Sequence, residues 1–212
     1  MLQIEKSIQE LRENLEKMTN ATEGMVCDVK EALEAEDREA LEGLFKSDKV
    51  LDKFEMILDQ QAVALLAQIN PMATDLRFVF SVIKLTVDLE RIGDECKNVA
   101  REMRSVKGAI VPELKEMAVK THDMIKAAFE ALLKQDTKKA REILLMDDEV
   151  DKLEYAIIGK YTNNIGIAFV AKALERIADH ATNIAENIVF VMEGIDIRHE
   201  NSIQNRLEKK TK

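Results

Sequence analysis

The chain has 212 residues, 46% of them hydrophobic and 33% charged, a balance that fits one or two globular domains and excludes a disordered or collagen-like chain. Its formal net charge of -9 at pH 7 disfavours non-specific binding to nucleic acid or to anionic lipid. With only 7 glycines and 2 prolines, turns are too few for a strand-rich fold, so we expect an all-α protein.

The first half of the chain predicts three long helices. Apolar or small residues recur at alternating steps of four and three from Ile4 to Leu33, the pattern of a heptad seam along one helix. Asp37 is predicted to cap a second helix, which begins near Arg38 and runs to a turn at 70–71. A third helix is expected from Met72 to about Met103.

The second half repeats this organisation after a linker at 108–112, where Pro112 suits the first turn of a helix. Asp136 stands 99 residues after Asp37 and is again predicted to cap a helix. The three helices expected here span Pro112–Lys134, Thr137 to about Tyr161, and Ile165 to about Gly194. We therefore expect two tandem, pseudo-symmetric three-helix bundles, at 1–107 and 112–194, followed by a polar tail at 195–212.

Two blocks of sequence occur once in each half, which is the strongest sign of an internal repeat. Residues 89–100 and 174–185 are identical at seven of twelve positions, and residues 48–55 resemble residues 147–154. The copies are 99 residues apart for the upstream block and 85 for the downstream block, so the second helical hairpin is 14 residues shorter. In each copy the two blocks are nearly equidistant from the hairpin turn, so they are expected to stand side by side.

These blocks carry carboxylates at steps of three and four residues, which places each set along one face of a helix. The residues concerned are Asp48, Asp52, Glu55, Glu90, Asp94 and Asn98 in the first half, and Asp147, Asp151, Glu154, Glu175, Asp179 and Asn183 in the second. Like charges brought together from two helices repel unless a cation neutralises them. Oxygen ligands of this kind suit hard cations such as Mg²⁺, Mn²⁺, Ca²⁺ or Fe³⁺.

A single acidic pair on a helix is usually a solvated face, but its repetition on two helices in both halves favours a ligand. A di-iron oxidase would need histidine three residues after Glu90 and Glu175, where Gly93 and Ala178 stand. The sequence also lacks a glycine-rich phosphate loop and a nucleophile–base constellation. Two alternatives to a metal-binding regulator stay open, namely a metal-free helical scaffold whose long seams serve dimerisation and a metal-dependent enzyme.

Other polar residues near the repeated blocks have structural interpretations. Arg91 and Arg176 follow the glutamates and are expected to form salt bridges within the bundle. His180 has Glu95 at the equivalent position of the first half, so we interpret it as a surface or packing residue rather than a ligand. Cys27 is expected to be a small residue of the core.

Targeting signals are not apparent in the sequence. No run approaches the roughly 18 apolar residues of a membrane span, and the N-terminal residues lack the basic and then apolar layout of a signal peptide. The two cysteines, Cys27 and Cys96, do not make a disulfide framework. A reducing cytoplasm is therefore the expected location.

The motifs at 89–94 and 174–186, in two tandem three-helix repeats, resemble the PhoU family of bacterial phosphate-uptake regulators, over about Met1 to Gly194. The resemblance implies that the family's paired carboxylates correspond to Glu90 with Asp94 and Glu175 with Asp179, and on the neighbouring helices to Asp48 with Asp52 and Asp147 with Asp151. It implies that these residues hold metal ions (Fe, Mn, Mg or Zn), including multinuclear iron clusters in some members. Asn98 and Asn183 would complete the shells.

The resemblance also implies a function. Such a protein would restrain a phosphate ABC transporter and help to switch off a membrane sensor histidine kinase when phosphate is plentiful, and it would not be an enzyme. We also expect a homodimer. Glu95-Cys96-Lys97 stands where the second copy has His180-Ala181-Thr182, so the two sites need not bind metal equally.

Overall fold

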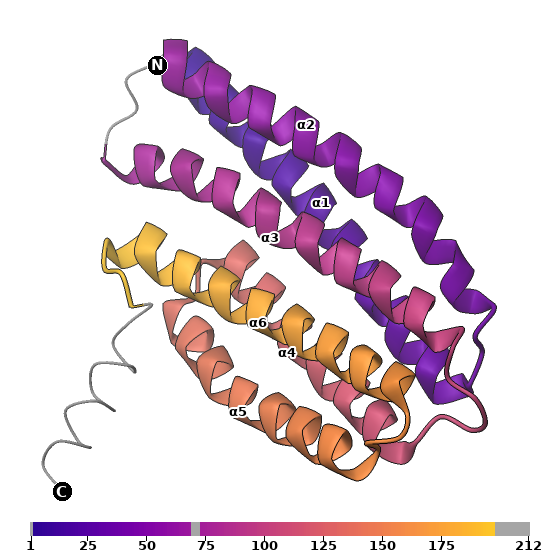
Figure 1. Cartoon of the computed structure of the whole chain (residues 1–212). Helices are drawn as coiled ribbons and strands as arrows, with labels where there is room; N and C mark the ends of the chain where they lie inside the picture. Colours follow the sequence, from indigo (N-terminus) through magenta and orange to yellow (C-terminus); the bar gives the residue numbers. More distant parts are fainter. Residues whose placement is uncertain (1, 69–72, 198–212) are drawn as a thin grey trace, which may run out of the picture.

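The computed structural model describes residues 2–68 and 73–197, and within them it consists of helices joined by short turns and loops, with no strand (Figure 1). The expected all-α class is therefore confirmed. The six long helices and one short 3-10 helix (η1) are α1 (Leu2–Ala35), η1 (Ala40–Gly43), α2 (Leu44–Gln68), α3 (Ala73–Met103), α4 (Pro112–Lys134), α5 (Thr137–Lys160) and α6 (Ile165–Glu193). The turn expected at 70–71 and the start expected at Met72 lie outside the described residues.

The second helix begins later than predicted. Arg38, where we placed its start, instead donates hydrogen bonds to the carbonyl oxygens of Val106 and Gly108, each at 2.6 Å. The Asp37 carboxylate accepts from the backbone N–H groups of the next residues, as a capping residue does, but the helix that follows is only η1. The chain is thus held against the linker after α3 before α2 starts, which a local helix signal cannot reveal.

The helices form two three-helix halves that pack against each other through α1 with α4 and α3 with α6. Helices α2 and α5 lie at opposite outer edges (Figure 1). Buried apolar side chains from both halves form one continuous hydrophobic core. The heptad seam predicted for α1 faces this core, since its buried members are Leu11, Leu15, Met18, Thr22, Met25, Val29 and Leu33.

The end of the described chain adds one residue to the core. Ile197 is only 6% exposed, although it lies in the stretch predicted as a polar tail at 195–212. Residues 198–212 lie outside the described residues. In the part of the chain that the structure covers, none of the helices combines the length and the apolar content that crossing a bilayer requires.

Two helix starts in the second half follow the predicted local signals. Pro112 occupies the first turn of α4. The Asp136 carboxylate accepts a hydrogen bond from the backbone N–H of Lys139 at 3.0 Å, which satisfies one free donor at the start of α5.

Replacing this cap should destabilise the protein by a modest amount. Asp136→Ala is expected to lower the free energy of unfolding by about 1 kcal/mol, because the N-terminal amides of α5 lose their acceptor. Urea denaturation of the wild type, Asp136→Ala and the exposed control Glu142→Ala measures the effect. A loss in Asp136→Ala no larger than that in Glu142→Ala would contradict the capping role.

Candidate functional site

The first acidic cluster lies between α2 and α3 and comprises Asp48, Asp52, Glu55, Glu90 and Asp94. The two helices approach closely here because α3 has a glycine at the contact. A Cβ atom at Gly93 would lie 2.5 Å from Cδ1 of the buried Leu51. The small residue thus sets the distance at which carboxylates of the two helices meet.

A lysine already stands within the first cluster. The Nζ atom of Lys97 lies 2.7 Å from Oδ2 of Asp48 and 2.6 Å from Oδ1 of Asp94, and so joins the two helices. The Asp48 side chain is only 12% exposed, so this ion pair is partly shielded from water. Burial opposes the charge on Lys97, yet its hydrogen bonds with the two aspartates raise its pKa above the ordinary value.

The remaining carboxylates of the first cluster are poorly neutralised. Burial raises the pKa of Glu90 to about 7, and the negative charges of Asp94 and Glu55 add to the shift. Burial also raises the pKa of Glu55, with further contributions from the negative charges of Asp59 and Asp52. This part of the cluster therefore holds protons, or would hold a cation, more readily than isolated carboxylates do.

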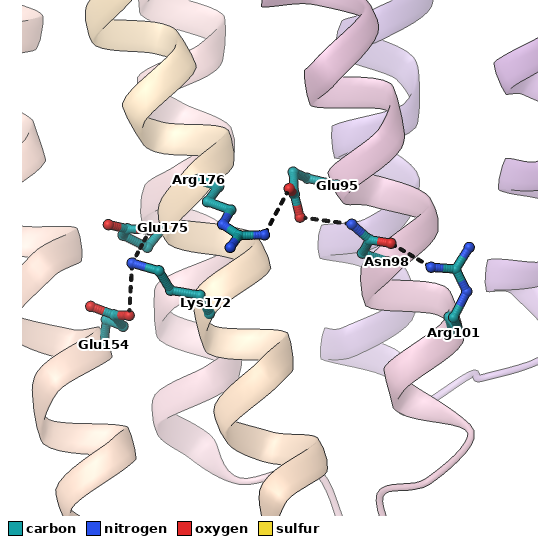
Figure 2. Close-up of polar contacts among 7 residues, drawn as sticks. All are labelled: Glu95, Asn98, Arg101, Glu154, Lys172, Glu175 and Arg176. Atoms are coloured by element: carbon teal, nitrogen blue, oxygen red, sulfur yellow. Dashed lines mark hydrogen bonds and ion pairs between the residues drawn. The ribbon is translucent and has the colours of Figure 1, made fainter.

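The second acidic cluster lies between α5 and α6 and comprises Asp147, Asp151, Glu154, Glu175 and Asp179. Its lysine, Lys172, reaches Glu175 Oε2 at 2.8 Å and Glu154 Oε1 at 3.3 Å (Figure 2). In the described structure no lysine lies within ion-pair distance of the three aspartates, although the charge of Lys172 also acts on Asp151 and Asp179.

Asp147, Asp151 and Asp179 of the second cluster repel one another, and burial adds to the cost of their negative charges. Burial raises the pKa of Asp147 to about 7, helped by the charges of Asp151 and Asp179. The pKa of Asp179 is also raised, first by burial and then by Glu175 and Asp151. A cation placed among the three aspartates would relieve this mutual repulsion.

The two clusters differ in where their lysine stands. The position of Lys97 in the repeat is taken by Thr182 in the second half, and that of Lys172 by Val87 in the first. Thr182 donates its hydroxyl to the backbone carbonyl of Asp179 at 2.7 Å and brings no positive charge. Buried carboxylate oxygens without a hydrogen-bond partner in the described structure are Oδ1 of Asp48 in the first cluster, and Oδ1 of Asp147 and Oε2 of Glu175 in the second. Of these three atoms, Glu175 Oε2 is ion-paired with Lys172.

The two predicted asparagine ligands make hydrogen bonds with residues other than the predicted metal ligands. Asn98 donates to Glu95 Oε2 at 3.0 Å and accepts from Arg101 at 2.6 Å (Figure 2). Asn183 donates to Asp88 Oδ1 at 3.3 Å. Within the described residues, no three Asp, Glu, His or Cys side chains are arranged to hold a metal ion.

The contact between the two halves is polar at its exposed face. Arg176 forms a salt bridge as expected, but not within its own bundle, because its partner is Glu95 of α3 in the other half, with 3.2 Å between Nη1 and Oε1 (Figure 2). His180 is confirmed as a packing residue, since its Nδ1 atom lies 2.9 Å from Oδ1 of Asp88. Sequence reasoning missed Asp88, although its repeat counterpart is the buried Ala173, and a charge at such a position indicates a buried polar partner.

The two cysteines occupy different environments. The prediction for Cys27 was wrong, because it is only partly buried and its Sγ atom contacts Glu31 Oε1 at 3.4 Å. Cys96 is fully buried, and burial raises the pKa of its thiol well above the ordinary value. A buried thiol of this kind is chemically inert, in agreement with the absence of a cysteine at the equivalent position, Ala181.

The fold and the clusters define a class of all-helical repeat protein in which two three-helix halves each carry an acidic cluster between their second and third helices. The sequence model of the PhoU domain matches residues 15–103 and again residues 114–188, so that each half corresponds to one copy. The chain belongs to the PhoU family.

Relatives and solved structures support this assignment along the whole repeat. The chain is 31% identical to the phosphate-specific transport system accessory protein PhoU homolog of Clostridium acetobutylicum, covering 90% of this chain and 94% of the relative. It is 30% identical to the homolog of Pseudomonas aeruginosa, covering 93% and 88%. The crystal structure of the phosphate transport system regulatory protein PhoU from Streptococcus pneumoniae superposes with a TM-score of 0.83 at 25% identity, covering 91% of this chain and 98% of the other.

Proposed function

We propose that this protein is a cytoplasmic regulator that restrains a phosphate ABC transporter and its sensor histidine kinase when phosphate is plentiful. The observation that carries the proposal is the match of both halves to the PhoU domain, because the relatives that share it are named as accessory proteins of phosphate transport. In this role the protein acts by binding its partners and not by catalysing a reaction.

Metal binding at the acidic clusters is a second part of the proposal. The donor set is all oxygen, which fits hard cations, and Oδ1 of Asp48 and Oδ1 of Asp147 are buried acceptors without partners in the described structure. In the first cluster, Lys97 stands between Asp48 and Asp94 and competes with a cation. The second cluster has no lysine among its aspartates and is therefore expected to bind a cation more tightly. A bound cation supplies positive charge, which would let an anionic or membrane-proximal partner approach.

A homodimer is the expected assembly. Large apolar side chains remain exposed on the surfaces of α3 and α6, including Phe80 at 46% and Phe169 at 55%. Exposed apolar side chains of this size favour contact with a partner or with a second copy. Sedimentation equilibrium of the purified chain distinguishes a monomer from a dimer, and a monomer at all concentrations would contradict this part of the proposal.

The regulatory role can be tested in a bacterium from which the resident PhoU has been deleted. Expression of this chain is expected to restore low phosphate uptake and low output of a phosphate-starvation reporter in phosphate-rich medium. The paired variant Asp147→Asn, Asp151→Asn should restore less repression than the exposed control pair Glu39→Gln, Glu142→Gln. Unrepressed uptake with a folded, abundant wild-type chain would contradict the proposed function.

The metal can be tested without any partner. Elemental analysis of the purified wild type is expected to find Fe, Mn, Mg or Zn in a fixed ratio to protein, and the double variant Asp94→Ala, Asp179→Ala should lose it. The control Glu39→Ala, Glu142→Ala should keep it. The alternative, a metal-free scaffold, predicts no metal in any of the three proteins after incubation with these ions. In that case the double variant should keep or gain stability.

A further inference from the structure

A cavity of about 210 Å³ lies where α1, α3, α4 and α6 meet, and neither acidic cluster contributes to its lining. Its apolar wall includes Leu15, Leu85 and Ile188, and its polar wall includes Arg12, Gln135 and Asn187. The cavity draws on both halves of the protein. One of its lining residues, Gln135, ends α4 in the left-handed conformation with φ 54°.

The internal repeat shows that an acidic residue of the first half is replaced by a neutral one at this cavity. Glu36 is the counterpart of Gln135, because both follow the first helix of their half and both have positive φ, 60° and 54°. Glu36 forms an ion pair with Lys115, with 2.7 Å between Nζ and Oε1. At the cavity, the neutral Gln135 replaces that acid. The turn after α1 therefore carries a carboxylate, whereas the equivalent turn after α4 carries none.

Arg12 is the positive charge left at the cavity. Its guanidinium stacks over the ring of Phe78, with 4.0 Å between Cζ and the ring centroid, and Phe78 also lines the cavity. Arg12 forms no ion pair of 4.0 Å or less within the described part of the chain. Burial lowers the pKa of Arg12, and the charge of Asp75 only partly opposes this effect. A guanidinium that is partly desolvated and unpaired is a binding group for an anion.

We propose that this cavity binds a single-chain amphipathic carboxylate, with its carboxylate at Arg12 and its apolar chain against Leu15, Leu85 and Ile188. Each methylene of such a chain that is buried against these side chains strengthens binding through the hydrophobic effect. With about 30 Å³ for a water-sized group, the cavity volume of about 210 Å³ fits about seven chain atoms. A free medium-chain fatty acid therefore matches both the size and the charge. Glu16, which also lines the cavity, weakens the attraction and limits the affinity.

Titration calorimetry with octanoate tests this proposal on the full chain, without any transporter component. One molecule per chain is expected to bind, whereas octanol, which lacks the charge, and acetate, which lacks the chain, should each bind at least about tenfold more weakly. Because the readout is ligand binding alone, its failure would leave the proposed regulatory function unaffected.

Three variants locate the site. Arg12→Gln should weaken octanoate binding about tenfold, whereas the control Arg101→Gln, on the exposed part of α3, should not change it. Glu16→Gln should strengthen binding several-fold by removing a negative charge from the cavity wall. Leu133→Trp, at a half-exposed lining position, should block the cavity while circular dichroism reports an intact helical fold. Equal octanoate affinity in the wild type, Arg12→Gln and Leu133→Trp would overturn the proposal, as would the absence of binding to the wild type.

Discussion

Replacing Lys97 with threonine, the residue that the second half has at this position, is expected to lower the free energy of unfolding of the metal-free protein by about 2–3 kcal/mol. Lys97 is the only cation within ion-pair distance of Asp48 and Asp94 in the described structure. Removing one partner of a fully buried pair typically costs 3–5 kcal/mol. The smaller value expected here reflects the partial exposure of Asp94, whose side chain is 48% exposed.

The measurement is urea denaturation with chelator at about pH 7.5. The matched control is Lys172→Val, which gives the second cluster the residue that the first half has at that position. Lys172 is 42% exposed, so its loss is expected to cost about 1 kcal/mol or less. If Lys97→Thr unfolds at the same urea concentration as the wild type, Lys97 does not neutralise the first cluster.

The same variant separates the roles of lysine and metal. Without Lys97, Asp48 and Asp94 face each other with no positive charge between them, as the aspartates of the second cluster do. Adding Mn²⁺ or Mg²⁺ should therefore stabilise Lys97→Thr more than the wild type, because a ligand that binds only the folded state raises its stability. Equal stabilisation of both proteins by the cation would argue against competition between Lys97 and metal.

Replacing Asp147 with asparagine is expected to stabilise the metal-free protein by about 1–2 kcal/mol at about pH 8. Burial and the charges of Asp151 and Asp179 raise the pKa of Asp147 to about 7 in the folded protein. Its ionisation above that pH therefore costs folding free energy. A shift of about three pKa units would correspond to about 4 kcal/mol, which solvent screening at this partly exposed position reduces.

The pH dependence fixes the sign of this prediction. Because the folded-state pKa of Asp147 is raised, the folded protein binds a proton more strongly than the unfolded chain between about pH 4 and pH 7. This contribution to stability is fully present at low pH and is lost as the pH rises through about 7. Asp147→Asn should therefore gain stability at about pH 8 and gain little at about pH 5. Urea denaturation at the two pH values, with the exposed Asp148→Asn as control, measures this gain in stability. A gain that is equal at both pH values would contradict the prediction.

The helices and the repeat could be read from the sequence with good accuracy because their causes are local. Low glycine and proline content and the spacing of apolar residues predicted six helices, and the carboxyl group of Asp136 caps α5 as its position predicted. Arg38 shows the limit of such signals. Its partners, Val106 and Gly108, are about 70 residues away in sequence, so no local pattern could place it against the linker.

The acidic clusters were only partly predictable. Periodicity places Glu90 and Asp94 on one face of α3, and antiparallel pairing places them level with Asp48 of α2, as the Lys97 bridge reflects. Which lysine pairs with which carboxylate depends on side-chain rotamers and on the close approach of α2 and α3 that Gly93 allows. The prediction that Asn98 and Asn183 complete metal shells is still untested, and both now hydrogen-bond elsewhere, Asn98 to Glu95 and Asn183 to Asp88.

The sequence by itself determined the all-helical class, the two-fold repeat and the presence of an acidic cluster in each half, because each follows from residue spacing along a helix and from pairing across one hairpin. Only the tertiary structure decided how the halves differ. Lys97 joins Asp48 and Asp94 in the first cluster, and Lys172 pairs with Glu154 and Glu175 in the second. Arg12 lies beside a cavity without an ion pair in the described structure. These differences depend on distances between helices that are far apart in sequence, and such distances are set by packing across the whole core.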